Sequence, residues 1–102
     1  MNFVETELSV INWAKDRKIF EQSSARSQMV KLIEECKELF DALYGIDEEA
    51  VIDSIGDMLV VLTLIAKFKN TNLTFCYEHA YNEIKDRRGR MINGVFVKEE
   101  NK

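Results

Sequence analysis

The sequence contains no proline in 102 residues, and this absence limits its folds more than any other feature. Proline ends helices and marks turns, so long helices can run without a break where it is missing. Most of the four glycines lie in the second half of the chain, at or near the expected ends of regular segments. This pattern is typical of helices joined by short turns, and it predicts an all-α fold.

Helical spacing of apolar residues predicts two helices in the first half of the chain. The first covers about residues 4–20, and the side chains expected to face inward are Leu8, Ile11 and Ala14, with Trp13 as a further candidate. The second starts after Ser23 or Ser24, either of which can cap its N-terminus, and ends near Tyr44. At that end Gly45 is expected to supply a left-handed turn.

Two more helices are expected in the second half of the chain. Asp47 can cap the third, which continues to about Lys69. The acidic first turn after Asp47 also favours a helix start here, because it complements the positive end of the helix dipole. The fourth can be capped by Asn72 or Thr74. It is expected to end near Gly89.

Two short segments are less clearly helical. Residues 60–65 are rich in β-branched side chains and also suit a buried strand. No turn signal separates them from residues 50–57, and a lone strand would have no partner, so a helix is the preferred interpretation. The tail, residues 91–102, has a short alternating piece at 94–97 that suits an extended strand.

Length and charge limit the functions to be considered. The length suits a single domain over residues 1–102, and the net charge of -4 gives no global attraction for polymeric nucleic acid or an anionic membrane. The longest apolar run, 58–66, is too short to span a bilayer. Cys36 and Cys76 match no metal or redox spacing and are expected to be buried thiols. The expected location is the cytoplasm, because the N-terminus lacks signal-peptide features.

The second predicted helix carries three carboxylates on one arc. On a helical wheel Glu34, Glu35 and Glu38 lie together, with Glu35 at the edge of the apolar stripe. That stripe consists of Leu32, Ile33, Cys36, Leu39, Phe40 and Leu43. Glu34 and Glu38 are like charges at i,i+4, which calls for a positive partner. The alternative is an ordinary solvated face neutralised by Lys31 and Lys37.

The third predicted helix carries a second acidic pair, Asp53 and Asp57, one turn apart. This helix is apolar nearly all round beyond Asp57, so the pair lies at the threshold of a buried segment. A carboxylate close to a core is rarely left without a partner, because uncompensated buried charge is costly. Several oxygen ligands without His or Cys favour a hard cation completed by phosphate and water, which indicates Mg²⁺.

These two motifs resemble the all-α nucleoside triphosphate pyrophosphohydrolases of the MazG-like superfamily. The core of the resemblance covers about residues 28–65 and rests on an ExxE motif in one helix and an ExxD motif in the next. The rest of the chain, including residues 81–90, resembles the short stand-alone bacterial and phage members. Glu35 and Glu38 match the first motif, Glu34 matches a further Glu before it, and Asp57 matches the final Asp. The chain departs from the family at Ser54, where the second motif normally has Glu. The fold that the resemblance implies is four-helix bundle-like with a short, extended C-terminal tail.

The resemblance implies Mg²⁺-dependent hydrolysis of a nucleoside triphosphate to a monophosphate and pyrophosphate, with Mn²⁺ as an alternative ion. The resemblance suggests Glu35, Glu38 and Asp57 as metal ligands. We add Asp53 as a fourth ligand, because it is next to Ser54 and one turn from Asp57, where it can replace the missing Glu. Glu34 is the expected catalytic residue, orienting or deprotonating the attacking water. The expected substrate-binding residues are Gln28, Lys31, Asn82, Lys85, Arg87, Arg88 and Arg90. For the basic cluster the alternative is stabilisation of a helix C-terminus.

Two other functions remain open at this stage. Without Glu at position 54, the chain is also interpretable as a regulatory homologue that binds nucleotide or metal with weak or no turnover. A purely structural helical interaction protein is a third hypothesis. The two-sided apolar face of the third predicted helix exceeds what a short chain can cover, so a homo-oligomer, either a dimer or a tetramer, is expected.

Overall fold

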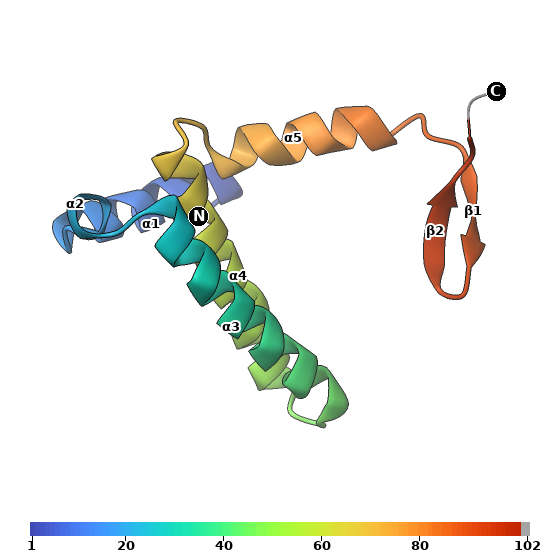
Figure 1. Ribbon diagram of the computed structural model, residues 1–102, viewed down its shortest axis with the longest axis horizontal. Coiled ribbons are helices and arrows are strands. Elements are labelled where there is room, and N and C mark those ends of the chain that lie inside the picture. The colour runs from blue at the N-terminus through green and yellow to red at the C-terminus, as the bar shows by residue number, and fades with distance from the viewer. Residues whose placement is uncertain (101–102) are drawn as a thin grey trace.

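The computed structural model describes residues 1–100, and over this range the chain forms five helices and one β-hairpin (Figure 1). The elements are α1 (Phe3–Asp16), α2 (Ile19–Gln22), α3 (Ala25–Tyr44), α4 (Glu48–Phe68), α5 (Leu73–Ile84), β1 (Gly89–Ile92) and β2 (Val95–Lys98). The predicted all-α fold with an extended C-terminal tail is confirmed. Residues 60–65 are helical, as preferred from the sequence.

The predicted first helix is broken in two. Lys18 adopts a left-handed conformation with φ of 59°, which ends α1 and starts the single turn of α2. Ile11 and Ala14 are buried as expected, at 8% and 0% exposure. Leu8 and Trp13 are not, because 55% and 44% of their surfaces remain exposed.

A long helical hairpin formed by α3 and α4 is the main packed unit. The Ser24 hydroxyl accepts a hydrogen bond from the Ser27 amide and caps α3, and Asp47 accepts one from Ala50 and caps α4. These caps satisfy amides that have no partner within the helix. Gly45 ends α3 in an extended conformation with φ of -87°, so the expected left-handed turn is wrong. Figure 1 shows the two helices running antiparallel along most of their length.

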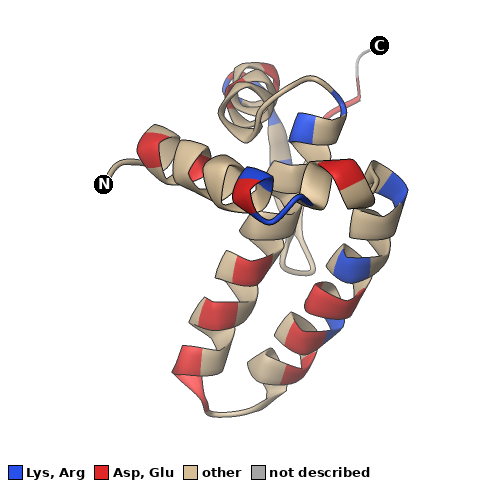
Figure 2. Ribbon diagram, turned by 90° about the vertical axis from the view of Figure 1, so that its left-hand side faces the viewer, with Lys and Arg blue, Asp and Glu red and all other residues tan. Residues whose placement is uncertain are grey.

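The core of the described chain is small and lies where α1 crosses the hairpin. Its buried apolar members are Ile11, Ala14, Leu32, Val61, Leu64 and Ala66. Figure 2 shows α1 crossing one end of the α3–α4 pair, with acidic residues spaced along both legs beyond the crossing. Both legs of the hairpin therefore carry acidic residues beyond the crossing with α1.

A buried carboxylate on α1 holds the start of α5. Glu7 is only 7% exposed and accepts hydrogen bonds from the amides of Leu73 and Thr74 and from the Thr74 hydroxyl. Asn72 is the N-cap of α5, one of the two capping residues predicted. We call the hydrogen bonds of Glu7 with Leu73 and Thr74 the Glu7 latch.

α5 ends at Ile84, five residues before the predicted end.

The tail forms a tight antiparallel hairpin rather than a single extended piece. Arg90 lies opposite Val97 and Ile92 opposite Val95, and Asn93 and Gly94 form the turn with φ of 51° and 81°. Positive φ at both central residues matches the twist of a two-residue hairpin. A side chain at Gly89 would collide with the Phe96 ring, so glycine allows the strands to pair there. Figure 1 shows the hairpin beyond the far end of α5, separated from α3 and α4.

Much apolar surface stays uncovered in this chain. The radius of gyration is 16.3 Å, whereas a compact domain of this length has about 13 Å. In the predicted core stripe of α3, Ile33, Phe40 and Leu43 are each about 60% exposed. Both cysteines are also exposed, so the prediction of buried thiols is wrong. A single copy thus leaves one face of the helical hairpin open.

None of the helices described has the length and apolar character needed to cross a membrane.

Candidate metal centre

Three carboxylates from the two legs of the hairpin meet at one point. One oxygen from each of Glu35, Glu38 and Asp57 lies within 4.8 Å of the other two. The one-turn spacing of the first two residues places them on one face of α3, and the antiparallel pairing brings Asp57 of α4 against them. Three negative groups at this separation repel one another unless a cation or protons lie between them.

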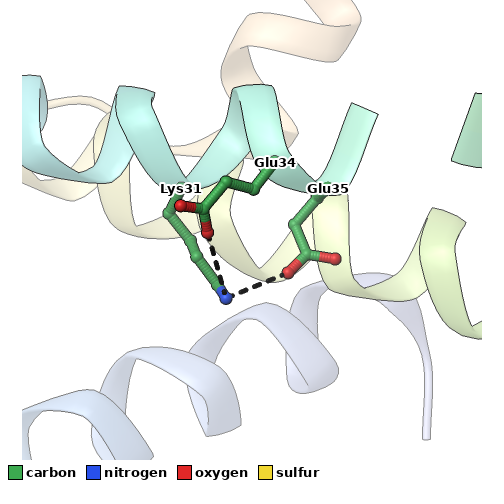
Figure 3. A network of polar contacts seen from close by, with 3 residues as sticks. All are labelled: Lys31, Glu34 and Glu35. Atoms are coloured by element: carbon green, nitrogen blue, oxygen red, sulfur yellow. Dashed lines mark ion pairs between the residues drawn. The ribbon is translucent and has the colours of Figure 1, made fainter. Parts of the chain in front are cut away.

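Glu35 is the member of this group that most needs a cation. It is 5% exposed, and its Oε2 atom is buried without a hydrogen-bond partner in residues 1–100. Figure 3 shows the Lys31 ammonium lying between Glu34 and Glu35, at 3.3 Å from Oε1 of Glu35 and 3.7 Å from Glu34. Lys31 therefore neutralises one side of the Glu35 carboxylate, and the other oxygen is open to a further ligand.

This crowding shifts the pKa values of two side chains of the site. The hydrogen bond that a protonated Glu38 makes to Glu35, followed by the charge of Glu35, raises the pKa of Glu38 above its usual range. Lys31 makes a hydrogen bond and an ion pair with Glu35, and both raise the pKa of Lys31. A raised carboxyl pKa means that the ionised form of Glu38 is unfavourable here until a positive charge joins the group.

The two predicted ligands of α4 have different environments. Both are exposed, but Asp57 joins the carboxylate group and Asp53 lies outside it. Ser54 is 6% exposed and buried on the same side of α4 as Val61 and Leu64. Position 54, where the second motif usually has Glu, thus points into the hairpin, and the neighbouring Asp53 is turned by about 100° around the helix.

The other predicted residues of α3 flank the group. Glu34 is exposed and is tied to the group through Lys31. Gln28 lies two turns earlier, where its side-chain amide donates to the Ser23 hydroxyl at 3.2 Å. Gln28 therefore already has a structural partner at the start of α3, whereas Glu34 is free to face solvent.

The predicted cations of the C-terminal segment gather elsewhere. Asn82, Arg87 and Arg88 line a polar pocket of about 450 Å³. Arg87, Arg88 and Arg90 line a larger one of about 710 Å³ between the two strands and the segment before them. In the described part of the chain none of these arginines forms an ion pair. Lys85 is exposed at the end of α5.

Comparison with protein families identifies the chain at this point. The model of the MazG nucleotide pyrophosphohydrolase domain matches residues 23–96. The chain belongs to the MazG nucleotide pyrophosphohydrolase family. The MazG match starts just before α3 and continues through α4, α5 and β1 into β2, so it includes the carboxylate group and the basic segment.

A phage protein is similar to part of this MazG chain. The "Uncharacterized 18.2 kDa protein in rep-hol intergenic region" of Haemophilus phage HP1 is 37% identical over 59 residues. This stretch is 58% of the present chain and 36% of the phage protein, so the chain matches only about a third of that relative's length. No solved structure gave a match.

One polar residue that organises the fold of this chain, Glu7, was not predicted from the sequence. Glu7 precedes Ile11 by four residues and Ala14 by seven, which places it on the buried stripe of α1. A lone carboxylate in an apolar helical stripe is a usable signal, because such a group needs strong hydrogen bonds. Its partners, 66 and 67 positions away, are visible only in the folded chain.

Proposed function

We propose that this chain is a Mg²⁺-dependent nucleoside triphosphate pyrophosphohydrolase that releases a nucleoside or deoxynucleoside monophosphate and pyrophosphate. The observation that supports it most directly is the Glu35–Glu38–Asp57 group with its buried, unpartnered Glu35 oxygen. Membership of the MazG family supports the same reaction class.

The residues present fit a hard divalent cation. Glu35, Glu38 and Asp57 offer only oxygen ligands, and no His belongs to this group in the described chain. Mg²⁺ usually takes one or more carboxylates and completes its shell with water and substrate phosphate. When bound, it supplies electrostatic stabilisation of the charge that develops on the phosphates. Mn²⁺ accepts the same ligands.

The chain's own side chains supply the remaining roles. Water attacks a phosphorus atom, the bond between the α and β phosphates breaks, and the water proton passes to a base. Glu34 is suited to accept that proton because it is exposed at the edge of the carboxylate group. Lys31 is suited to bind a phosphate oxygen from the same edge, and Gln28 lies on the same flank.

A panel of NTPs and dNTPs incubated with Mg²⁺ tests the proposal. We expect stoichiometric release of pyrophosphate and monophosphate from at least one of them, and loss of both products in EDTA. Release of orthophosphate instead would contradict cleavage between the α and β phosphates. Ser54 favours the second candidate, a binding homologue with little turnover, which predicts Mg²⁺-dependent nucleotide binding by calorimetry without release.

The two aspartates of α4 are expected to respond differently to amide substitution. Asp57→Asn should lower kcat/KM by about 100-fold, because about 3 kcal/mol of electrostatic stabilisation corresponds to that factor. Asp53→Asn should cost less than about tenfold, because Asp53 lies outside the group. Steady-state kinetics on the best substrate of the panel measures both. Equal losses would show that Asp53 does replace the Glu missing at position 54.

We also propose that the chain acts as a homo-oligomer, either a dimer or a tetramer. Exposed Ile33, Phe40 and Leu43 on α3 and Ile52 on α4 support this state, as does the large radius of gyration. Monomeric proteins rarely leave so much contiguous apolar surface in water. Base and sugar specificity then depends on side chains from more than one chain.

A further inference from the structure

The acidic and basic halves of the candidate site lie apart in one chain. The carboxylate group belongs to the α3–α4 hairpin, whereas Arg87, Arg88 and Arg90 belong to the segment after α5. Figure 1 shows that segment projecting away from the α3–α4 hairpin. The pockets described for residues 1–100 include two around the arginines, and neither is lined by the three carboxylates. One chain therefore presents two incomplete halves of a site.

Residues 73–98, which we call the C-terminal arm, carry apolar surface that stays exposed within residues 1–100. Tyr77, Tyr81 and Ile84 recur at helical spacing along α5 and are 71%, 61% and 52% exposed. On the hairpin Met91 and Val95 are 64% and 63% exposed. An isolated two-stranded hairpin is at best marginally stable in water, so this one requires a packing surface.

The arm and the helical hairpin have complementary charges. Residues 85–98 contain five Lys or Arg residues and one carboxylate, a net charge of +4. Residues 31–57 contain nine carboxylates and two lysines, a net charge of -7. Opposite fields on two uncovered surfaces favour their association and fix its orientation.

The geometry of the arm keeps its cations away from the carboxylates of the same chain. The Glu7 latch fixes the first turn of α5, and the helix extends from there for 12 residues. The four residues that join α5 to β1 span at most about 14 Å, so the β1–β2 hairpin stays near the far end of α5. If the arm docks on a second copy, a closed two-fold dimer forms this contact twice, once for each arm.

We propose that the C-terminal arm docks on a second copy of this chain and brings Arg88 and Arg90 to the triphosphate at that copy's Glu35–Glu38–Asp57 group. Arg88 and Arg90 are two apart in an extended segment, so their side chains lie on the same face. Arginine suits this role because its guanidinium binds phosphate through two parallel hydrogen bonds. The inference rests on the proposed function, and it makes every active site a product of two chains.

Mixed oligomers test the shared site. One parent carries Glu38→Gln and the other Arg88→Ala with Arg90→Ala, and each alone should have on the order of 1% of wild-type activity. Mixed oligomers purified through two different tags should recover about half of wild-type activity in a dimer, because one site receives both intact halves. Activity that stays at the level of the parents would overturn the proposal.

A matched control reverses this expectation. A chain with all three substitutions, mixed with wild type, should give almost no activity in a dimer, because each site then lacks one half. If each chain supplied its own arginines, this mixed dimer would keep about half of wild-type activity, which would also overturn the proposal. Arg26→Ala removes an exposed arginine outside the arm and should leave activity unchanged.

A measurement without substrate separates this inference from the proposed function. Light scattering should give the mass of an oligomer. Carbodiimide treatment of mixed ¹⁴N and ¹⁵N chains should join Lys85 or Lys98 to carboxylates of residues 34–57 as heavy–light pairs. Heavy–light pairs would support docking of the arm on a second copy. If the same protein releases no pyrophosphate, the proposed reaction is refuted and the docking is not. A monomeric mass, or cross-links only within one chain, would refute the docking.

Discussion

Glu38→Gln is expected to lower kcat/KM by at least about 100-fold while leaving the metal-free protein as stable as the wild type or more so. The loss of activity follows if Glu38 is one of the three proposed oxygen ligands, since several kcal/mol of electrostatic stabilisation would depend on them. The variant therefore separates function from folding at a single position.

The stability side of this expectation follows from the raised pKa of Glu38. The hydrogen bond to Glu35 and the Glu35 charge favour the protonated form in the folded chain. The stability that protonated Glu38 contributes is fully present below its unfolded-state pKa, and it is lost as the pH rises through the raised folded-state value. Glutamine retains the neutral form at all pH values, so near neutral pH it removes repulsion without leaving a cavity.

Thermal unfolding with and without Mg²⁺ measures both effects in one protein. For the wild type, Mg²⁺ at ten times its Kd should add about 1.4 kcal/mol. Glu38→Gln should lose most of this gain. Glu21→Gln, an exposed carboxylate on α2, is the matched control and should behave as wild type. If Glu38→Gln retained turnover and Mg²⁺ stabilisation, Glu38 would not be a ligand.

Glu7→Ala is expected to destabilise the fold by about 2 to 4 kcal/mol and to lower activity as well. The substitution removes a buried carboxylate and leaves the amides of Leu73 and Thr74 without their acceptor. Hydrogen bonds to charged groups contribute about 1.5 to 3 kcal/mol each, and an unsatisfied buried donor adds to the loss. Because the latch orients α5, its loss also frees the arm that carries the arginines.

Denaturant unfolding at one fixed protein concentration measures the stability change, since the stability of an oligomer depends on concentration. In a chain of this length 1 kcal/mol corresponds to about 4 to 8 °C in Tm, so the Tm should fall by roughly 10 °C or more. Glu78→Ala removes an exposed carboxylate from α5 and should be nearly neutral. A neutral Glu7→Ala would show that α5 is held by other contacts.

The sequence predicted the N-terminal caps of the helices better than their C-terminal ends. Ser24, Asp47 and Asn72 were predictable caps because each bond joins groups three residues apart. The break at Lys18 was not, because lysine in a left-handed conformation has no local signature, unlike glycine. Apolar periodicity simply continues through it.

The burial of apolar side chains was harder to predict than the helix face on which they lie. The apolar face of α3 was identified correctly as a stripe, yet Phe40 and Leu43 lie on the surface of this chain. Periodicity shows which residues share a face, and it does not show whether the same chain or another chain covers that face. The same limit applies to the arginines after α5, whose identity the sequence indicates and whose partner surface it does not.

The candidate site was partly predictable for a related reason. Glu35, Glu38 and Asp57 meet because i,i+3 spacing and antiparallel helices are regular. The choice between Asp53 and position 54 depends on the rotation of α4 about its own axis, which the packing of Val61 and Leu64 determines. A helical wheel gives the angles between residues of one helix, and it does not show which of them face the partner helix.

The ion pair between Lys31 and Glu35 gives the resting protein a counter-ion of its own. Its ammonium lies 3.3 Å from Oε1, whereas Oε2 has no hydrogen-bond partner in residues 1–100, so a divalent ion bound at Oε2 would share the carboxylate with the lysine. Lys31 would then stand beside both the ion and an entering phosphate. The proposed uptake of a cation and binding of an anion would thus depend on the same lysine side chain.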